Sequence, residues 1–175
     1  MKEKLKALFF KKHILLQQGS EANDLIVKKG YGYKEDGYFY LSFFEAFYLL
    51  EKNLIEIYDT KNRIITKDDF LNLARRNISN FYIKYRVFRD LRNKGYVVKS
   101  GLKFGSDFRV YDKGKLPGQE HAKWLVYCIT ENDKVPAHEF ASKNRVANTT
   151  KKRILLAISD DEGSITYYEI KWLRL

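Results

Sequence analysis

The chain has 175 residues, 45% of them hydrophobic and two of them proline, so it is globular rather than disordered and long enough for one domain or two small ones. Its formal net charge of +11 favours a polyanionic partner, such as nucleic acid or an anionic membrane surface, with a merely soluble basic protein as the alternative. Its single cysteine, Cys128, excludes an intrachain disulfide and argues against a cysteine-based zinc site. The chain contains no run of ~20 apolar residues, which predicts a cytoplasmic protein without a membrane span.

The first half of the chain predicts a small α/β unit. The predicted elements are stretches of strand-forming residues at 5–18 and 24–33, a helix over 41–53, a strand over 54–59 and a helix over 66–77. Asp36-Gly37 is a hairpin-turn signal. Ser42 and Glu45 have capping-box spacing, and Thr66 is the expected N-cap of the second helix.

The second half predicts a mixed sheet with helices. Its elements are a helix over about 80–94, strands at 96–99, 104–111 and 121–130, a helix over 137–148, and strands at 154–159 and 165–173. Gly95 is a natural stop for the first of these helices, and Pro136 precedes the second. The fold class is therefore α/β, of the α+β type, with two small mixed domains at 1–80 and 81–175, the second with a central mixed sheet flanked by helices.

Positive charge is concentrated in two stretches of the second half. Residues 75–99 contain eight basic side chains and one acidic one, Asp90. Residues 143–153 contain five basic side chains and no acidic one, around the expected end of a helix and start of a strand. A solvated helix face accounts equally well for the first cluster, whereas the second is suited to an RNA phosphate.

A tyrosine and a histidine flank the lysine- and glycine-rich loop between two predicted strands. Tyr111 ends the first strand and His121 begins the second. Histidine serves as acid or base near neutral pH, tyrosine is a poor base unless cations stabilise its phenolate, and lysine offsets charge on a phosphate. Tyr111, His121 and Lys152 would suit cleavage of RNA by its own 2′-hydroxyl if the last strands pair beside this loop. Of the other histidines, we expect both His13 and His138 to be structural.

A metal-dependent nuclease is the alternative chemistry. Asp107, Glu120 and Lys123 approach the Asp…Glu-x-Lys pattern of such enzymes, but the spacing is Glu-x-x-Lys. No His, Asp or Glu spacing resembles a metal cage, and no P-loop or dinucleotide-binding glycine pattern is present. The sequence therefore predicts no metal and no cofactor.

Three sequence blocks resemble the catalytic domain of the tRNA-splicing endonucleases. They are YRVFRDLRNKGYVVKSGLKFGSDFRVY, HAKWLVY and RVANTTKKRILLAI, within residues 85–175. The N-terminal half is similar, less specifically, to the smaller α/β domain of the archaeal enzymes. One such catalytic block in a chain of this length is typical of the homotetrameric archaeal form.

The resemblance implies a role for each residue of the trio. Tyr111 would be the general base on the 2′-hydroxyl, His121 the general acid, and Lys152, the second of a lysine pair, the group that stabilises the transition state. The products would be a 2′,3′-cyclic phosphate and a 5′-hydroxyl, without metal, from a precursor tRNA with a bulge–helix–bulge. A non-catalytic RNA-binding subunit is the competing function. Loop 112–120 carries more lysine than is usual in the family, which leaves its conformation open.

Two further expectations concern RNA and self-association. The resemblance implies that Arg145 clamps a flipped bulge base together with a second planar residue, Trp172 or Arg174, both placed in the last strand. The alternative for Trp172 is a position in the hydrophobic core. An acidic turn on a basic chain would bind another copy, so its three acids are predicted subunit contacts: Asp160, Asp161 and Glu162.

Overall fold

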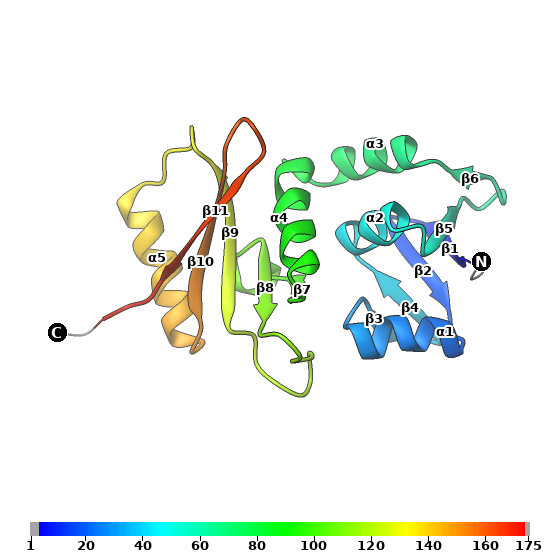
Figure 1. The fold of residues 1–175 in the computed structure, drawn as a ribbon, viewed down its shortest axis with the longest axis horizontal. Coiled ribbons are helices and arrows are strands. Elements are labelled where there is room, and N and C mark those ends of the chain that lie inside the picture. The colour runs from blue at the N-terminus through cyan, green and yellow to red at the C-terminus, as the bar shows by residue number, and fades with distance from the viewer. Residues whose placement is uncertain (1–3, 174–175) are drawn as a thin grey trace. The chain divides into compact units, whose positions relative to one another are not determined.

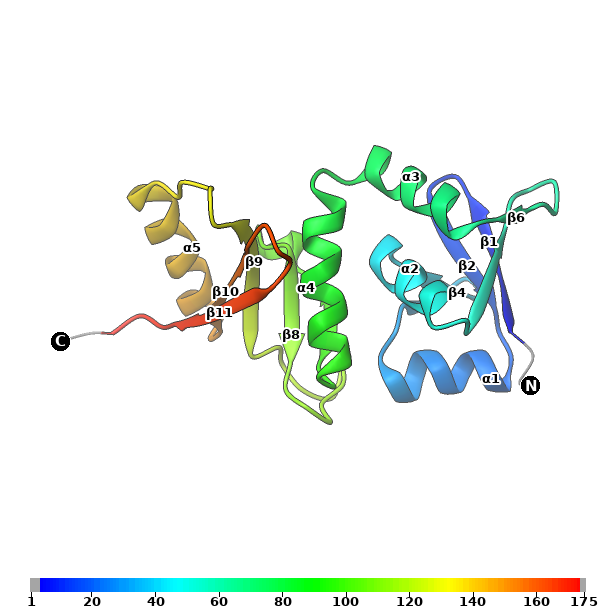
Figure 2. The same ribbon diagram turned by 45° about the horizontal axis from the view of Figure 1, so that its top comes forward.

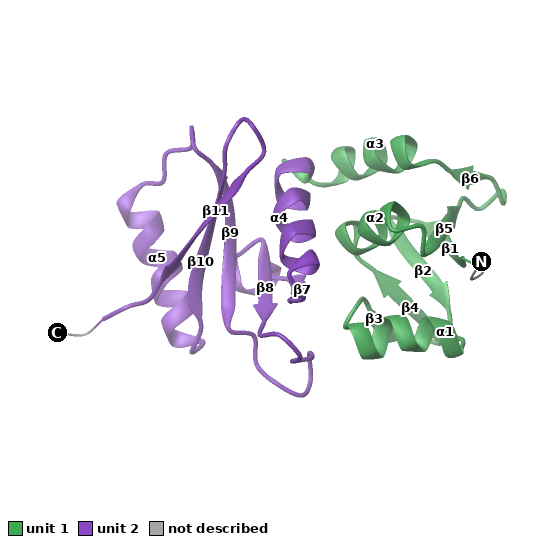
Figure 3. Cartoon of the chain, in the orientation of Figure 1, with its two compact units in different colours: residues 1–81 green, residues 82–175 purple. Residues whose placement is uncertain are grey.

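The structure is a computed structural model that describes residues 4–173, and the chain divides into two compact units, residues 1–81 and 82–175 (Figure 3). Each described unit combines helices with one mixed sheet, so the predicted α+β class is confirmed. None of the helices in residues 4–173 has the length and apolar character needed to cross a bilayer.

Unit 1 is built on a six-stranded sheet in the order β3-β4-β2-β1-β5-β6 (Figure 1). Its strands are β1 (Leu5–Phe10), β2 (His13–Gln17), β3 (Tyr33–Glu35), β4 (Tyr38–Leu41), β5 (Ile55–Tyr58) and β6 (Ile64–Ile65). Its helices are α1 (Ser20–Asn23), continued by the π-helical turn η1 (Asp24–Lys28), α2 (Phe43–Glu51) and α3 (Lys67–Asn77). Phe70 of α3 packs against Phe43 and Phe47 of α2, whose rings are buried.

Local sequence signals set the turns and caps of this unit as predicted. Asp36 and Gly37 both have positive φ, at 46° and 83°, in the turn that joins β3 to β4. The Ser42 hydroxyl accepts a hydrogen bond from the Glu45 backbone, and the Glu45 carboxylate accepts one from the Ser42 backbone. Thr66 caps α3 by accepting from the Asp69 backbone at 3.2 Å.

The predicted β-structure over 24–33 is wrong for most of its length. Residues 20–28 form α1 and η1, and only Tyr33 belongs to a strand. Ala22, Leu25 and Ile26 are buried, at spacings of three and four residues. That helical period buries one apolar stripe, which outweighs the strand propensity of the β-branched residues.

Unit 2 has a five-stranded sheet in the order β11-β10-β9-β8-β7, in which β9 and β10 are parallel and the other pairs antiparallel. Its strands are β7 (Val97–Ser100), β8 (Phe108–Tyr111), β9 (Trp124–Thr130), β10 (Arg153–Ser159) and β11 (Ile165–Ile170). Its helices are α4 (Phe81–Asn93), the 3₁₀ turn η2 (Leu102–Phe104) and α5 (Ala137–Thr149).

The two long helices cover opposite faces of this sheet (Figures 1 and 2). Phe88 of α4 packs against Phe108 of β8. Leu125 and Ile154 lie on the other face and pack against Ala147 of α5. Because α5 is the crossover between the parallel strands β9 and β10, it returns the chain to the end of the sheet at which β9 begins.

Three strand boundaries in unit 2 differ by more than one residue from those predicted. Strand β8 begins at Phe108 rather than residue 104, because η2 occupies residues 102–104. Strand β9 begins at Trp124, so His121 lies in the preceding loop and not in a strand. Strand β11 ends at Ile170, so Trp172 follows the last strand instead of belonging to it.

Candidate active site

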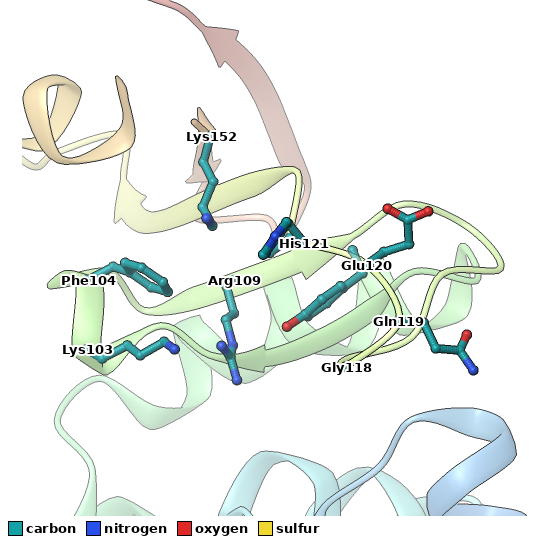
Figure 4. Close-up of a pocket in the computed structure, with 10 residues that line it drawn as sticks. Lys103, Phe104, Arg109, Gly118, Gln119, Glu120, His121 and Lys152 are labelled. Carbon is teal, nitrogen blue, oxygen red and sulfur yellow. The ribbon is translucent and has the colours of Figure 1, made fainter. Parts of the chain in front are cut away.

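A pocket of about 300 Å³ lies in unit 2 at the β8–β9 loop (Figure 4). The side chains that give it chemical character are Lys103, Phe104, Arg109, Tyr111, His121 and Lys152. The structure therefore brings Tyr111, His121 and Lys152 to one pocket from three separate segments of the chain.

The sheet register explains why these three residues converge. Tyr111 ends β8, and the antiparallel register pairs Val110 of β8 with Trp124 of β9, while the Lys123 backbone donates to the Val110 carbonyl at 2.9 Å. His121 therefore lies across from the end of β8. The parallel strand β10 starts beside β9, with the Arg153 backbone donating to the Lys123 carbonyl at 3.0 Å, which brings Lys152 to the same edge.

Lys152, and not its neighbour Lys151, lines this pocket. Its Nζ donates to the Thr150 carbonyl at 2.8 Å and lies 5.1 Å from the centroid of the Phe104 ring. Burial lowers the pKa of Lys152, and the positive charges of Lys103 and Arg109 lower it further. Three cations close enough to affect one another, in a partly buried site, create a strong attraction for an anion.

Two exposed ion pairs involve the 112–120 loop, of which residues 118–120 line the pocket. The Asp112 carboxylate pairs with Lys123 at 3.0 Å, and Glu120 pairs with Lys115 at 2.9 Å. The hydrogen bond from Lys123 lowers the pKa of Asp112, and the one from Lys115 lowers the pKa of Glu120. Of the two lysines in this loop, Lys115 thus holds a carboxylate and Lys113 lies over the Tyr96 ring; exposed ion pairs of this kind contribute little stability singly.

The residues of the metal-nuclease alternative do not converge. Asp107 pairs with Lys84 at 2.9 Å and accepts a hydrogen bond from the Cys128 backbone at 2.8 Å. Glu120 and Lys123 are each held by a partner in the loop described above. Across residues 4–173, no three or more His, Cys, Asp or Glu side chains are grouped as a metal site would require.

The remaining histidines and the cysteine do not line the pocket. His13 is exposed at the start of β2, with its ring edge-on to Tyr40, and His138 is exposed in the first turn of α5. Cys128 is half-buried in β9, and burial raises the pKa of its thiol, with Asp107 adding to the effect. The thiol is therefore a packing group rather than a nucleophile.

Arg145 and Trp172 line a second hollow, of about 460 Å³, beside α5. Arg145 is exposed in the third turn of the helix. Trp172 is 56% exposed, so the alternative of a core tryptophan is wrong. Arg174, the other residue expected to pair with Arg145, lies outside the described residues.

The three acids of the β10–β11 turn differ in their surroundings. The Asp160 carboxylate accepts hydrogen bonds from the Gly163 backbone at 2.6 Å and the Ser164 backbone at 2.7 Å, which closes the turn. Asp161 and Glu162 are exposed. Asp161 and Glu162 are therefore the more accessible of the three acids.

Sequence reasoning assigned no role to Lys103, Phe104 or Arg109, which also line the pocket. Arg109 had a readable signal: it lies two residues before Tyr111 on a strand, so alternation points both side chains to one face. Lys103 and Phe104 reach the pocket from a 3₁₀ turn, whose direction no period of two or 3.6 predicts.

A pocket that combines a phenol, an imidazole and several cations has the composition of an acid–base site for a phosphate ester. Residues 81–167 match the family described as tRNA intron endonuclease, catalytic C-terminal domain, and residues 5–71 match its N-terminal domain. The chain belongs to the tRNA intron endonuclease family, which confirms the resemblance seen in the sequence.

Named relatives cover nearly the whole chain. It is 40% identical over 152 residues to the "tRNA-splicing endonuclease" of Thermococcus gammatolerans, a match that spans 87% of this chain and 88% of that one. It is 38% identical over 161 residues to the protein of the same name from Methanothermobacter thermautotrophicus, spanning 92% and 93%. For the Nanoarchaeum equitans protein the identity is 41% over 140 residues, spanning 77% and 89%.

Proposed function

We propose that this chain excises introns from precursor tRNA by metal-independent attack of a 2′-hydroxyl on the adjacent phosphate. Tyr111, in its phenolate form, accepts the 2′ proton while the 2′-oxygen–phosphorus bond forms. The bond from phosphorus to the 5′-oxygen breaks, and His121 donates a proton to the departing oxygen. Lys152 offsets the charge that grows on the phosphorus oxygens. The products are a 2′,3′-cyclic phosphate and a 5′-hydroxyl.

The observation that carries this proposal is the convergence of Tyr111, His121 and Lys152 in one pocket. The reaction needs a base, an acid and a cation within reach of one phosphate, and the pocket supplies one of each. Family membership supports the substrate class, and we place the reaction in the cytoplasm, where precursor tRNA is made in archaea. A catalytic unit of this kind would occupy residues 81–175, with residues 1–80 as the accompanying domain.

The test is incubation with an intron-containing precursor tRNA in EDTA, followed by analysis of the new RNA ends. We expect cleavage at both splice sites that leaves cyclic phosphate and 5′-hydroxyl ends. Activity lost in EDTA and restored by Mg²⁺ would favour a metal-dependent nuclease. RNA binding without cleavage under any of these conditions would favour a non-catalytic subunit.

We propose that Arg145 and Trp172 hold a flipped base of the bulge–helix–bulge. Both side chains border the same hollow, and both are exposed planar groups. A guanidinium and an indole stack on opposite faces of a base without reading its sequence, which suits recognition of a bulge by shape.

We also propose a homotetramer in which Asp161 and Glu162 contact a basic surface of another subunit. They are the exposed acids of a turn on a chain with a net charge of +11. The test is the double variant Asp161→Lys/Glu162→Lys, with the mass in solution measured by light scattering. Asp160 is kept because its carboxylate closes the turn. A smaller assembly is expected, an unchanged one excludes the turn as a contact, and a monomeric parent protein excludes the tetramer.

A further inference from the structure

The proposed reaction uses one of the three cations in the pocket and leaves two unexplained. Lys103, Arg109 and Lys152 reach the pocket from η2, from β8 and from the residue just before β10 (Figure 4). None of the three forms an ion pair with a carboxylate of the described residues. Glu120 also lines the pocket, but its carboxylate pairs with Lys115, so an anion that enters the pocket would relieve the repulsion among the three cations.

Arg109 has an unsatisfied donor at the pocket. Its Nε is buried and has no hydrogen-bond partner among the described residues. Its guanidinium carbon lies 5.9 Å from the centroid of the Tyr111 ring, two residues further along the same strand. A buried donor without a partner costs free energy, and a ligand oxygen would recover this cost if the guanidinium turned its Nε toward the pocket.

Lys103 is held at the pocket by a constrained turn. A side chain at Gly101 would collide with the Ser106 hydroxyl and the Phe108 backbone, and Gly105 has a φ of 67°. The buried Ser106 hydroxyl donates to the Phe108 carbonyl at 3.0 Å. The Nζ atoms of Lys103 and Lys152 both lie 5.1 Å from the centroid of the Phe104 ring, which gives the two ammonium groups a common support.

We infer that Arg109 and Lys103 bind the non-bridging oxygens of the scissile phosphate, with Arg109 making the directional contact and Lys103 adding charge. This inference rests on the proposed function. A phosphodiester carries one negative charge and the five-coordinate transition state carries two, so added cations stabilise the transition state more than the substrate. The planar fork of arginine matches two phosphate oxygens, whereas lysine acts as a point charge. Tyr111 and His121 remain available for proton transfer.

The experiment pairs protein variants with a substrate change at a single atom. Precursor RNA is made with sulfur in place of one or the other non-bridging oxygen at a splice site, and single-turnover rates are measured at saturating protein. The wild-type protein should cleave one of the two diastereomers more slowly, because sulfur is a poor hydrogen-bond acceptor. Arg109→Ala should cleave the all-oxygen RNA about 10²–10³-fold more slowly, the usual loss for one donor to a developing charge. It should also lose the difference between the diastereomers.

Two more variants and a control separate the contact from a structural effect. Arg109→Lys should recover part of the rate but not the diastereomer difference, since it restores charge without the fork. Lys103→Ala, a change at an exposed residue, should slow both diastereomers alike and less than Arg109→Ala does. Lys113→Ala is the matched control, because Lys113 packs over Tyr96 outside the pocket and its loss should leave the rate unchanged.

The outcomes separate the inference from the function on which it rests. A wild-type protein that cleaves both diastereomers equally, or an Arg109→Ala variant that keeps the wild-type difference, overturns the phosphate contact while leaving the cleavage reaction intact. A wild-type protein that cuts no precursor RNA overturns the proposed function itself. Circular dichroism of each variant shows whether a lower rate reflects unfolding, and Arg109→Lys supplies the answer if Arg109→Ala does not fold.

Discussion

Two groups of cations in unit 2 have opposite surroundings. Six cations outside the pocket each have a carboxylate partner: Lys84 with Asp107, Lys94 with Asp90, Lys115 with Glu120, Lys123 with Asp112, Lys143 with Glu139, and Arg153 with Glu169. Lys103, Arg109 and Lys152 line the pocket, and none of them has such a partner among the described residues. The paired cations are satisfied within the chain, so their loss acts on the fold. The pocket cations have no carboxylate partner of this kind and can bind an incoming anion, so their loss should act on binding and chemistry.

The largest effect expected from this comparison is on the chemical step. His121→Ala and Lys152→Ala should each lower the single-turnover cleavage rate at saturating protein, the first by about 10²–10⁴-fold, the usual worth of a general acid or base. His138→Ala is the control, because His138 is exposed on α5 and does not line the pocket. Rates near that of the parent for both pocket variants would remove them from the mechanism.

The paired group should show the reverse pattern. Asp107→Ala leaves Lys84 without its carboxylate and the Cys128 backbone N–H without its acceptor. We expect a loss of about 1–3 kcal/mol in the free energy of unfolding, measured by urea denaturation, with the cleavage rate of the folded protein nearly unchanged. Glu139→Ala, which breaks an exposed helical pair with Lys143, should cost less than ~1 kcal/mol. Loss of cleavage by folded Asp107→Ala would show that the division between the two groups is wrong.

Arg145 extends the comparison to a cation outside the pocket. Arg145→Ala should lose roughly 1–3 kcal/mol of interaction with a bulged base, and Arg145→Lys should recover little, because lysine has charge but no plane to stack. The measurement is cleavage of precursors with the bulge base present or replaced by an abasic site. Full recovery of the cleavage rate by Arg145→Lys, or equal losses of rate on both substrates, would mean that Arg145 acts only through its charge.

The smallest effect concerns the stability cost of the pocket itself. Burial and neighbouring cations lower the pKa of Lys152 below its ordinary value of 10.5, so the folded state binds this proton less tightly than the unfolded chain does. The charged lysine therefore disfavours folding at pH 7, and this penalty fades as pH rises toward 10.5. Lys152→Gln should raise the Tm by ~2 °C at pH 7, and the gain should shrink in alkaline solution. An equal gain from Lys113→Gln would trace the effect to net charge alone.

The sequence predicted those parts of the fold whose signals are local. The Ser42–Glu45 cap, the Asp36-Gly37 turn and the stop at Gly95 each depend on residues within a few positions of one another. The helix over 20–28 was missed because its β-branched residues resemble a strand, although Ala22, Leu25 and Ile26 carried the helical period.

The residues of the candidate site could be predicted from the sequence, but their meeting in one pocket could not. Tyr111, His121 and Lys152 could be named from the motif, yet their meeting depends on the parallel pairing of β9 with β10, which no short stretch encodes. Lys103 was not predicted because a 3₁₀ turn sets the direction of its side chain. Asp160 differs from the other two acids of its turn through hydrogen bonds to the turn backbone, which the sequence alone does not show.

The α5 crossover also determines at which stage of synthesis and folding the protein can cleave RNA. During synthesis Tyr111 and His121 leave the ribosome well before Lys152, and α5 must form and return before β10 can pair beside β9. Such non-local pairing is slow compared with the closure of the β7–β8 hairpin, because the chain must first lose the entropy of a long loop. A nascent chain therefore carries the base and the acid while lacking the cation, and in the proposed reaction it would be harmless to the RNA of the ribosome that makes it.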